Sequence, residues 1–479
     1  MQQDSGIKAV SRRAFLGAAA LGAASAGFLR SQTAAKPNVL FIAIDDLNDW
    51  IGCLGGHPSV KTPNLDRLAK RGVLFTKAYC SAPLCNPSRA SLMFGRRPSS
   101  TGVYENNQPP RESPVLKDAL SLTQHFRNNG YRVIGGGKIY HGHFPDPASW
   151  DEYFPSQTKN QPDNPEPKKK PGNGIPNTSH FDWSPVEASD AEMGDMKTVA
   201  WVSKQLHAKQ NKPLFLACGI FRPHLPWYVP PKYFDQYPLS TATLPKVKED
   251  DLDDVPPEGV KMAKPDGDHK KVLEHKQWEK AVQAYLACIS FADACVGKLL
   301  EALDSSPMAK NTAIVLWSDH GWHLGEKLHW RKFTLWEEAT RSVMMMSVPG
   351  ITKPGSVCDR TVSLLDVYPT LTAVCGLPPG KDVEGDSLLP LLKDPAAKWD
   401  RPVVTTFHQN NHSVRDERWR YIRYHDGTEE LYDHQSDPME WTNLASRAEH
   451  ASVKARLAKW LPKVNLKPSP SQKTTGLAD

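Results

Sequence analysis

The sequence has no long apolar run, no dominant sign of charge and no cysteine framework. Its mean hydropathy of −0.51 excludes an integral membrane protein, and the apolar stretch near the N-terminus is too short to predict a membrane span. A formal net charge of +6 over 479 residues is too weak to indicate nucleic-acid binding. Eight cysteines without metal-ligand spacing make a disulfide framework unnecessary in a chain of this length. The chain is long enough for one large and one small domain, and no internal repeat is evident.

The most informative stretch that is present lies at residues 85–89, Cys-Asn-Pro-Ser-Arg. It follows a segment of strand character at residues 73–80, its proline favours a first helical turn, and Gly95 is a plausible helix stop. Cys85 would then lie at or next to the N-cap, where unpaired N–H groups and the helix dipole favour an activated nucleophile or a bound oxyanion. Arg89, one turn along, would lie on the same side, and a guanidinium there suits sulfate or phosphate.

Acidic residues end two apolar runs far apart in the chain. Residues 39–44 and 313–317 both read as buried strands of parallel type; the first ends in Asp45-Asp46 and the second leads into Asp319-His320. Because ligands gather outside the carboxyl ends of such strands, the two tips are expected to converge. Carboxylates packed together repel unless a cation holds them, and oxygen ligands favour Ca²⁺ or Mg²⁺. Alternatively, Asp45-Asp46 forms only a turn or a helix cap.

Three further segments place basic groups after strand-like runs. Residues 131–134 lead through three glycines, which would let the backbone approach a ligand, to Lys138 and His141. Residues 214–217 lead to the proline-rich loop that carries His224, and Lys332 follows further downstream. Taken one at a time, the lysines could be solvated and the histidines could be ordinary hydrogen-bonding residues.

These stretches together resemble the sulfatase family. Residues 85–89 with Gly95-Arg96 match its Cys-x-Pro-Ser-Arg motif, and the departures at Met93 and Phe94 fall on positions expected to pack. The local sequence is most similar to the iduronate-2-sulfatase-like branch of the formylglycine-dependent type I sulfatases. This branch has His at the position of His320, where many other sulfatases have Asn. The resemblance runs from about residue 36 to residue 438, with the following segments carrying most of it: residues 85–98, 137–141, 222–224, 319–322 and 324–326.

The resemblance implies a fold, a cofactor and a site. The fold is an α/β alkaline-phosphatase-like sandwich, with a large mixed, mostly parallel sheet between helices and a smaller C-terminal α+β subdomain. One Ca²⁺ ion and formylglycine formed from Cys85 are expected. The implied metal ligands are Asp45, Asp46, residue 85, Asp319 and His320. The implied catalytic residues are Cys85, Arg89, Lys138, His141, His224 and Lys332.

Their expected roles follow from sulfatase chemistry. Hydrated formylglycine, polarised by the metal and Arg89, attacks sulfur, while the metal, Lys138 and Lys332 neutralise the growing charge. His224, with Lys332, protonates the leaving alcohol. His141 then takes a proton from the second hydroxyl, which expels sulfate and regenerates the aldehyde.

The expected substrate is a sulfated glycan, from whose terminal sugar an exo-acting enzyme removes a sulfate ester, with uronate 2-O-sulfate as the specific hypothesis. A uronate would need further cations, for which Arg97, Arg222 and Arg331 are candidates. Two alternatives stay open. One is a phosphomonoester or phosphonate-ester hydrolase of the same superfamily, and the other is a non-catalytic glycan-binding relative.

The N-terminal segment predicts export. Residues 1–35 resemble a twin-arginine signal, with Arg12-Arg13 before a run of small residues, so the twin-arginine machinery and a formylglycine-installing enzyme are expected partners. Because that route carries folded proteins, formylglycine would be installed in the cytoplasm. The mature protein is then bacterial and periplasmic or exported, with no stable membrane insertion and no nucleic-acid partner. Its expected parts are a catalytic domain (36–399), a C-terminal subdomain (400–466) and a disordered polar tail (467–479).

Three local predictions complete the analysis. The proline- and lysine-rich stretch between residues 154 and 183 predicts a long surface insertion that is mobile or lines the pocket rim. An apolar helix over residues 279–303 carries Cys288 and Cys295 two turns apart, which favours core packing. Residues 421–424 and 430–432 alternate like short antiparallel strands.

Overall fold

A computed structural model describes residues 1–2, 36–178 and 180–473. Beyond its first two residues, the expected export signal lies outside the described residues, as does the end of the polar tail, 474–479. The chain from Pro37 onward forms one compact unit, to which the description below is confined.

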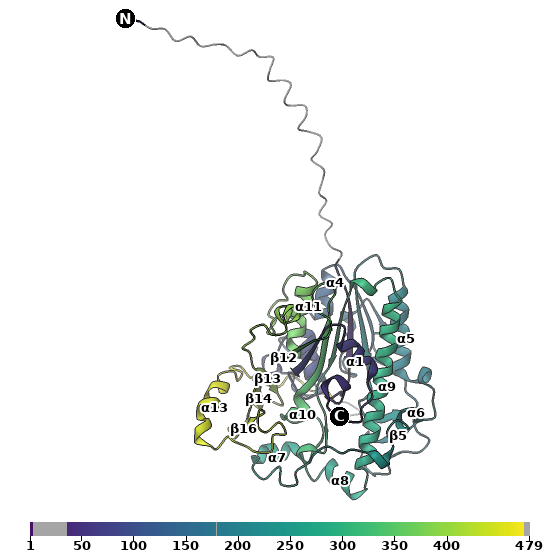
Figure 1. The fold of residues 1–479 in the computed structure, drawn as a ribbon, viewed down its shortest axis with the longest axis vertical. Helices are drawn as coiled ribbons and strands as arrows, with labels where there is room; N and C mark the ends of the chain where they lie inside the picture. The colour runs from purple at the N-terminus through teal and green to yellow at the C-terminus, as the bar shows by residue number, and fades with distance from the viewer. Residues whose placement is uncertain (3–35, 179, 474–479) are drawn as a thin grey trace. The chain divides into compact units, whose positions relative to one another are not determined.

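An eight-stranded mixed sheet is the centre of that unit (Figure 1). One strand, β11, runs antiparallel to both its neighbours, and the other paired strands are parallel. In spatial order the strands are β12 (Ser356–Ser363), β2 (Val73–Tyr79), β11 (Arg341–Ser347), β8 (Thr312–Ser318), β1 (Asn38–Ile44), β6 (Leu214–Ile220), β3 (Arg132–Gly137) and β4 (Glu152–Phe154). The predicted mixed, mostly parallel sheet is confirmed.

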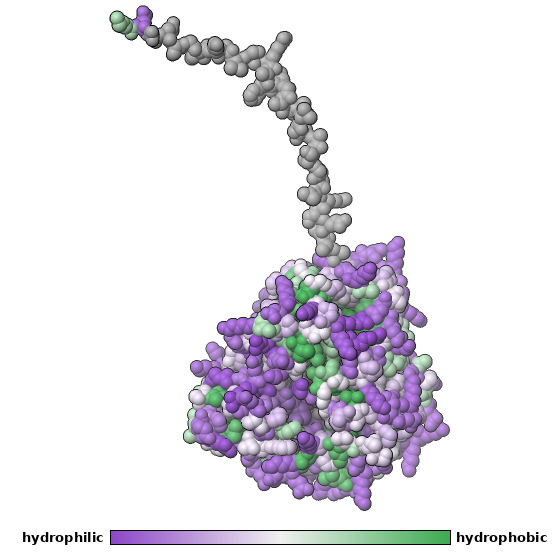
Figure 2. Space-filling model, viewed as in Figure 1, coloured by the Kyte–Doolittle hydropathy of each residue, from purple (hydrophilic) through white to green (hydrophobic). Residues whose placement is uncertain are grey.

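Helices cover both faces of the sheet because its central strands are apolar on both sides. Along β1, Leu40, Ile42 and Ile44 enter one hydrophobic core, whereas Val39, Phe41 and Ala43 enter the other. The first core is covered by α1 (Pro63–Ala69), α5 (Gly194–His207) and α9 (Trp278–Asp304). The second is covered by α2 (Cys85–Phe94), α4 (Leu122–Asn128), α11 (Val367–Val374) and α12 (Leu389–Lys393). Hydrophilic residues cover most of the molecular face seen in Figure 2.

A second, four-stranded antiparallel sheet forms near the C-terminus, with α13 (Ala451–Ala458) packed on it. Its strands are β13 (Val403–Thr406), β14 (His412–Arg415), β15 (Trp419–Arg423) and β16 (Glu429–Asp433). The antiparallel strands predicted at residues 421–424 and 430–432 are therefore confirmed. The remaining elements are short: α3 (Pro98–Thr101), α6 (Pro231–Phe234), α7 (Pro257–Ala263), α8 (Asp268–Glu274), α10 (Glu337–Thr340), β5 (Trp183–Pro185), β7 (Trp227–Val229), β9 (His323–Leu324) and β10 (Trp330–Arg331).

Three predictions need correction. The stretch over residues 154–183 is not only a surface insertion, because Ile175 and Phe181 are fully buried in the first core. The tail is ordered as far as it is described: the backbone N–H groups of Ser469 and Gln472 donate to Gly102 and Asn107. The glycines before Lys138 serve the sheet and not a ligand, since a Cβ on Gly137 (φ 81°) would lie 1.8 Å from the carbonyl oxygen of Gly219.

The cysteine and membrane predictions can also be compared with the structure. Cys288 and Cys295 are buried in α9, as their spacing predicted. The structure describes all eight cysteines, and no two of them form a disulfide. Among the residues that the structure describes, no helix is both long and apolar enough to cross a membrane.

Candidate active site

The acidic tips of β1 and β8 meet, as predicted. The two strands are parallel neighbours with Ile44 opposite Ser318, so the residues that follow emerge side by side. The backbone N–H of Asp46 donates to Asp319 Oδ1 over 3.1 Å. Asp46 turns the chain in the left-handed conformation (φ 57°), which Asp adopts more readily than most residues. The prediction that the carboxyl ends of these strands form one site is confirmed.

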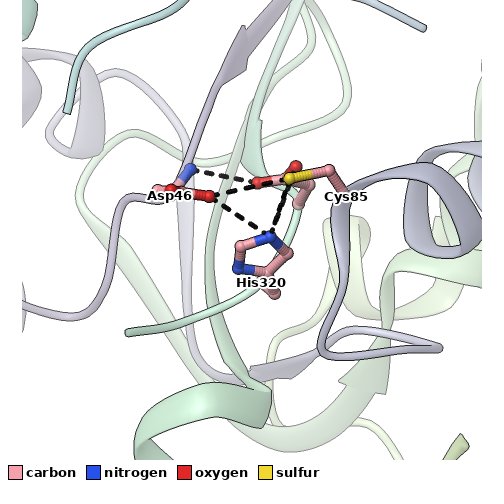
Figure 3. Close-up of side chains that lie close together, drawn as sticks. Asp46, Cys85 and His320 are labelled. Atoms are coloured by element: carbon pink, nitrogen blue, oxygen red, sulfur yellow. Dashed lines mark hydrogen bonds and ion pairs between the residues drawn. The ribbon is translucent and has the colours of Figure 1, made fainter. Parts of the chain in front are cut away.

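Cys85 opens α2 directly beneath these carboxylates. Leu84 is the N-cap, Cys85 is the first helical residue, and Gly95 ends the helix with φ 68°. Cys85, Asp46 and His320 point toward one another (Figure 3). The Cys85 Sγ lies 3.4 Å from His320 Nε2 and 3.8 Å from Asp46 Oδ1. The helix start that the sequence predicted therefore delivers residue 85 to the acidic cluster.

Two lysines also reach the Cys85 sulfur. Lys332 Nζ lies 2.9 Å from Sγ and Lys138 Nζ lies 3.8 Å from it. Burial nevertheless raises the pKa of the Cys85 thiol well above its usual range, although both lysines act to lower it. The unmodified side chain is accordingly a thiol and a poor nucleophile.

Arg89 holds the two acidic tips together. Its side chain is completely buried; Nη2 donates to Asp45 Oδ1 over 2.7 Å and Nε to Asp319 Oδ2 over 2.8 Å. Its Nη1 donates to the carbonyl oxygens of Lys138 and Ile139. This arrangement does not support the expectation that the guanidinium binds the oxyanion directly. Arg89 organises the carboxylates instead, a task for which its fork of donors is suited.

Positive and negative charges balance in the buried base of the site. Lys138 Nζ lies 2.5 Å from Asp45 Oδ2, and Lys332 Nζ lies 2.9 Å from Asp46 Oδ1. With Arg89 and Asp319, three cations face three carboxylates. A bound divalent cation would make this base net positive, which suits an anionic ester.

The pKa values of the three carboxylates are not all shifted in the same direction. Burial raises the pKa of Asp45, although Lys138 opposes it. Burial also acts to raise the pKa of Asp46 and Asp319, but electrostatic interactions with their neighbours outweigh it: with His224 and Lys332 at Asp46, and with Arg89 at Asp319. The pKa of Asp46 is therefore lowered, and that of Asp319 lies well below its usual range. Asp46 and Asp319 are the carboxylates most firmly held in the ionised form that binds a metal.

The donor set fits a cation. Ligand atoms of Asp46, Cys85, Asp319 and His320 all lie within 4.8 Å of one another, a spread that oxygen–Ca²⁺ distances of about 2.3–2.6 Å can bridge. His320 Nδ1 lies 2.9 Å from the Gly321 carbonyl oxygen and donates to it, so Nε2 turns its lone pair toward Asp46 Oδ1, 3.3 Å away. Burial lowers the pKa of His320, which favours this neutral form. This lone pair is therefore available to a cation bound among the carboxylates.

His224 is held at the edge of this cluster by its own loop. Its Nε2 lies 3.8 Å from Asp46 Oδ2. Arg222 Nη1 donates to the His224 carbonyl oxygen over 3.2 Å, and Asp195 at the start of α5 accepts the backbone N–H groups of Phe221 and Arg222. The loop is therefore anchored to a helix, which fixes the position of the imidazole.

His141 lies across a cavity of about 630 Å³ that Lys138, Arg222 and His224 also line. Residues 158–166 form another wall of the same cavity, which confirms that the proline-rich stretch lines the pocket rim. Asn160 is buried there, and its Nδ2 donates to the carbonyl oxygens of Tyr140 and His141 over 3.1 and 3.0 Å. Cavities of this size typically bind small ligands.

The three candidate arginines separate in space. Arg222 lines the cavity, whereas Arg97 lies beyond the end of α2 and pairs with Glu384, so it does not serve the site. Arg331 pairs with Asp268 over 2.7 Å and lies 3.4 Å from His180, whose ring is 6.3 Å from that of His224.

Sequence reasoning missed two positioning residues, Asp195 and Asn160. Asp195 begins a helix, and Asn160 lies in a polar loop. Nothing in either local pattern distinguishes them from ordinary caps and loop residues.

Comparison with protein families agrees with this geometry. The Sulfatase family model matches residues 37–377, and the model for the C-terminal region of N-sulphoglucosamine sulphohydrolase matches residues 325–467. The chain belongs to the sulfatase family, and it is a sulfuric ester hydrolase.

The chain is also similar to individual proteins and to a solved structure. A sulfatase of Formosa agariphila is 41% identical over 90% of this chain and 87% of its own length. Iduronate 2-sulfatase of Mus musculus is 31% identical over 71% of this chain and 69% of its own. The crystal structure of a phosphonate monoester hydrolase of Agrobacterium radiobacter superposes with a TM-score of 0.72 at 25% identity, covering 88% of this chain and 94% of that one.

Proposed function

We propose that the enzyme hydrolyses sulfate esters of a sulfated carbohydrate, with formylglycine formed from Cys85 and one Ca²⁺ ion beside it. The observation that carries this proposal is the meeting of Cys85 with Asp46, Asp319 and His320 in a buried, ligand-like cluster. Formylglycine, once formed and hydrated, would supply a nucleophilic oxygen and a second hydroxyl. Ca²⁺, when bound, would supply positive charge next to the nucleophile and the sulfate. Asp45, with Asp46, Asp319 and His320, would hold the ion.

The residues around the cluster divide the proton transfers between them. Lys332 and Lys138 face residue 85 and stabilise the charge that grows on the sulfate oxygens. His224, with Lys332, donates a proton to the ester oxygen as the alcohol leaves. His141 takes a proton from the second hydroxyl as the bond to sulfate breaks. Arg89 keeps Asp45 and Asp319 in register throughout.

The specific substrate proposed is a 2-O-sulfated uronate at the end of a glycan. The enzyme would be exo-acting and remove the sulfate ester from this terminal sugar. The likeness to iduronate 2-sulfatase supports it, and Arg222 in the cavity wall is a cation near which a uronate carboxylate would lie. Defined sulfated disaccharides test this choice. Sulfate release only from neutral sugars would overturn the uronate assignment and leave the sulfatase assignment intact.

The mass of the peptide that contains residue 85 tests the nucleophile. Enzyme produced with a formylglycine-installing enzyme should carry the aldehyde mass and release sulfate. Full turnover by protein that carries only the unmodified thiol would contradict the proposal.

Phosphonate-ester or phosphomonoester hydrolysis is the second candidate, which the similarity to a phosphonate monoester hydrolase favours. Turnover of aryl sulfate, aryl phosphate and aryl phosphonate by one preparation separates the activities. A higher kcat/KM for the phosphorus esters would make this second candidate the main activity. A glycan-binding protein without catalysis would show carbohydrate affinity and no formylglycine.

The site of action proposed is the bacterial periplasm or exterior. The twin-arginine-like segment before residue 36 supports export by that machinery after the catalytic domain (36–399) and the C-terminal subdomain (400–466) have folded. Replacing Arg12 and Arg13 by lysine should retain the enzyme in the cytoplasm. Normal export of that variant would exclude the twin-arginine route.

A further inference from the structure

Strand β1 ends in a buried turn that carries two of the proposed metal ligands, Asp45 and Asp46. Asp46 is completely buried and adopts the left-handed conformation, with φ 57°. A residue other than glycine keeps such a backbone only where the surrounding structure over-determines it. Leu47 and Asn48, which continue the turn, are buried as well. Their backbone groups therefore need hydrogen-bond partners inside the protein.

The hydroxyl of Tyr285, on helix α9, supplies two of these partners. It accepts the backbone N–H of Asn48 over 3.0 Å and donates to the carbonyl oxygen of Asp46 over 2.7 Å. The Tyr285 side chain is completely buried, and the centre of its ring lies 5.3 Å from that of Trp227 and 5.7 Å from that of Trp50. Packing of the ring thus fixes the hydroxyl, and the hydroxyl closes the turn from the side of α9.

The hydroxyl of Ser318, the last residue of β8, holds the same turn from the other side. It accepts the backbone N–H of Leu47 over 3.1 Å and donates to the carbonyl oxygen of His320 over 3.0 Å. One buried hydroxyl therefore joins the turn after β1 to the segment after β8. These two segments carry Asp46 and His320, whose side chains point toward each other (Figure 3).

Both hydroxyls bond to the backbone of the ligand-bearing segments, so they act on the ligands indirectly. Loss of the Tyr285 hydroxyl would leave the Asn48 N–H and the Asp46 carbonyl oxygen unpaired in the interior, a cost that a shift of the turn would relieve. Loss of the Ser318 hydroxyl would do the same at Leu47 and His320. Because Asp46 has an unfavourable backbone conformation, a shift of the turn would also move its carboxylate out of the cluster.

We propose that Tyr285 and Ser318 are positioning residues for the cation site, whose hydroxyls hold Asp46 and His320 in the arrangement that binds Ca²⁺. The inference rests on the Ca²⁺ ion of the proposed function and deepens it. Groups that orient metal ligands in this way contribute to metal affinity although they do not bind the metal themselves.

The test is the affinity for Ca²⁺, measured by calorimetry on protein from which a chelator has removed the metal. Tyr285→Phe keeps the packed ring and removes only the hydroxyl, and it should weaken Ca²⁺ binding about ten- to a hundredfold. Ser318→Ala should have an effect of the same order. In enzyme with residue 85 converted, the Ca²⁺ concentration that gives half-maximal sulfate release should rise by the same factor. Saturating Ca²⁺ should restore most of the turnover, because all the ligands are still present.

Two matched controls remove buried hydroxyls at the opposite ends of the same strands. Tyr131→Phe removes a hydroxyl that donates to the carbonyl oxygen of Pro37, just before β1, over 2.9 Å. Ser306→Ala removes one that accepts the backbone N–H of Met308 over 3.2 Å and donates to the carbonyl oxygen of Leu303 over 2.8 Å, before β8. These controls should lower the thermal midpoint as much as the test variants do and leave the Ca²⁺ affinity at the parent value.

The outcomes separate this inference from the proposed function. Parent-like Ca²⁺ affinity in Tyr285→Phe and Ser318→Ala, or equal weakening in the two controls, would overturn the positioning role and leave the proposed function intact. Weakened Ca²⁺ binding in the two test variants, with no sulfate release from any ester by the converted parent, would reject the proposed function alone. A parent protein that binds no Ca²⁺ would reject both.

Discussion

The base of the site and its walls are built on different principles. The base consists of side chains at the ends of β1 and β8 and in the first turns of α2; its charged members are completely buried, and each has a partner of opposite charge. The walls of the cavity beside it are loops, chiefly residues 158–166 and the loop that carries His224. Rigid elements hold the chemistry, and loops are free to vary with the substrate.

The difference predicts how substitutions behave. A change to a charged residue of the base removes a partner from a dry, charge-balanced cluster, so it affects turnover and stability together. A change in a wall leaves that cluster intact and alters which ester is chosen.

Removal of the nucleophile from the base should have the largest effect on turnover. Cys85→Ala should fold normally and lower kcat/KM by about four orders of magnitude or more, because no other group can form the bond to sulfur. Cys85→Ser should be equally inactive in a host that converts only cysteine. Sulfate release assays, with circular dichroism as the folding control, decide it; appreciable turnover by Cys85→Ala would remove the central claim.

Loss of the cation should have the next largest effect. Asp319→Asn should weaken Ca²⁺ binding and lower turnover by about two to three orders of magnitude, since it removes charge at the point where the metal and Arg89 meet. Metal content by mass spectrometry and activity before and after chelation are the measurements. Full activity in protein shown to be free of metal would mean that the cluster has been misread.

Arg89→Lys probes the base through stability. A lysine cannot span Asp45, Asp319 and two carbonyl oxygens at once, so breaking these buried pairs should cost about 3 kcal/mol of unfolding free energy. Urea denaturation measures the loss. The matched change Arg71→Lys, at an exposed pair with Asp304, should cost less than about 1 kcal/mol. Equal losses at the two positions would erase the contrast between buried and exposed pairs.

His224 lies between the base and the wall. The effect of replacing it on the rate of hydrolysis should depend on the leaving group. His224→Gln should slow hydrolysis of sugar sulfates about a hundredfold, because an alkoxide leaves poorly without a proton. Aryl sulfates, whose phenolate leaves readily, should be slowed much less. Equal slowing of both ester classes would argue for a binding role and against proton donation.

Asn160 in the wall should give the smallest effect. Asn160→Ala removes donors to the carbonyl oxygens of Tyr140 and His141, which should cost about 1–3 kcal/mol in stability and lower turnover only several-fold. Thermal unfolding and steady-state kinetics measure both. A loss of turnover as large as that of Asp319→Asn would show that Asn160 is as important to catalysis as the residues of the base.

Much of the base could be predicted from short stretches of sequence. Residues 39–44 and 313–317 are apolar and lead to acids, and parallel strands place such ends together by register alone. Cys85 lies at a helix start because Pro87 favours the first turn and Gly95 ends it. The meeting of the acids therefore followed from local patterns plus one rule of sheet geometry, whereas the place of Cys85 and His320 among them was implied by the resemblance to sulfatases.

Roles and walls could not be predicted in the same way. Arg89 was expected to face the oxyanion, but its donors go to Asp45, Asp319 and two carbonyl oxygens, which only the folded chain brings within reach. The glycines before Lys138 proved to serve close strand packing against Gly219. Arg97 follows the motif closely in sequence and yet pairs with Glu384 outside the site.

The sequence by itself determined the central strands, the start of α2 and the meeting of the acidic strand ends, because each depends on local propensity and on the regular geometry of a parallel sheet. The other members of the buried cluster were implied by the resemblance to sulfatases. Only the tertiary structure decided which donor meets which acceptor and which distant loops enclose the ligand. The loop over residues 158–166, the loop that carries His224, and Lys332 are far apart in the chain, and no periodicity relates them. Their meeting depends on packing across the whole fold, which is why the chemistry could be predicted from sequence and the shape of the pocket could not.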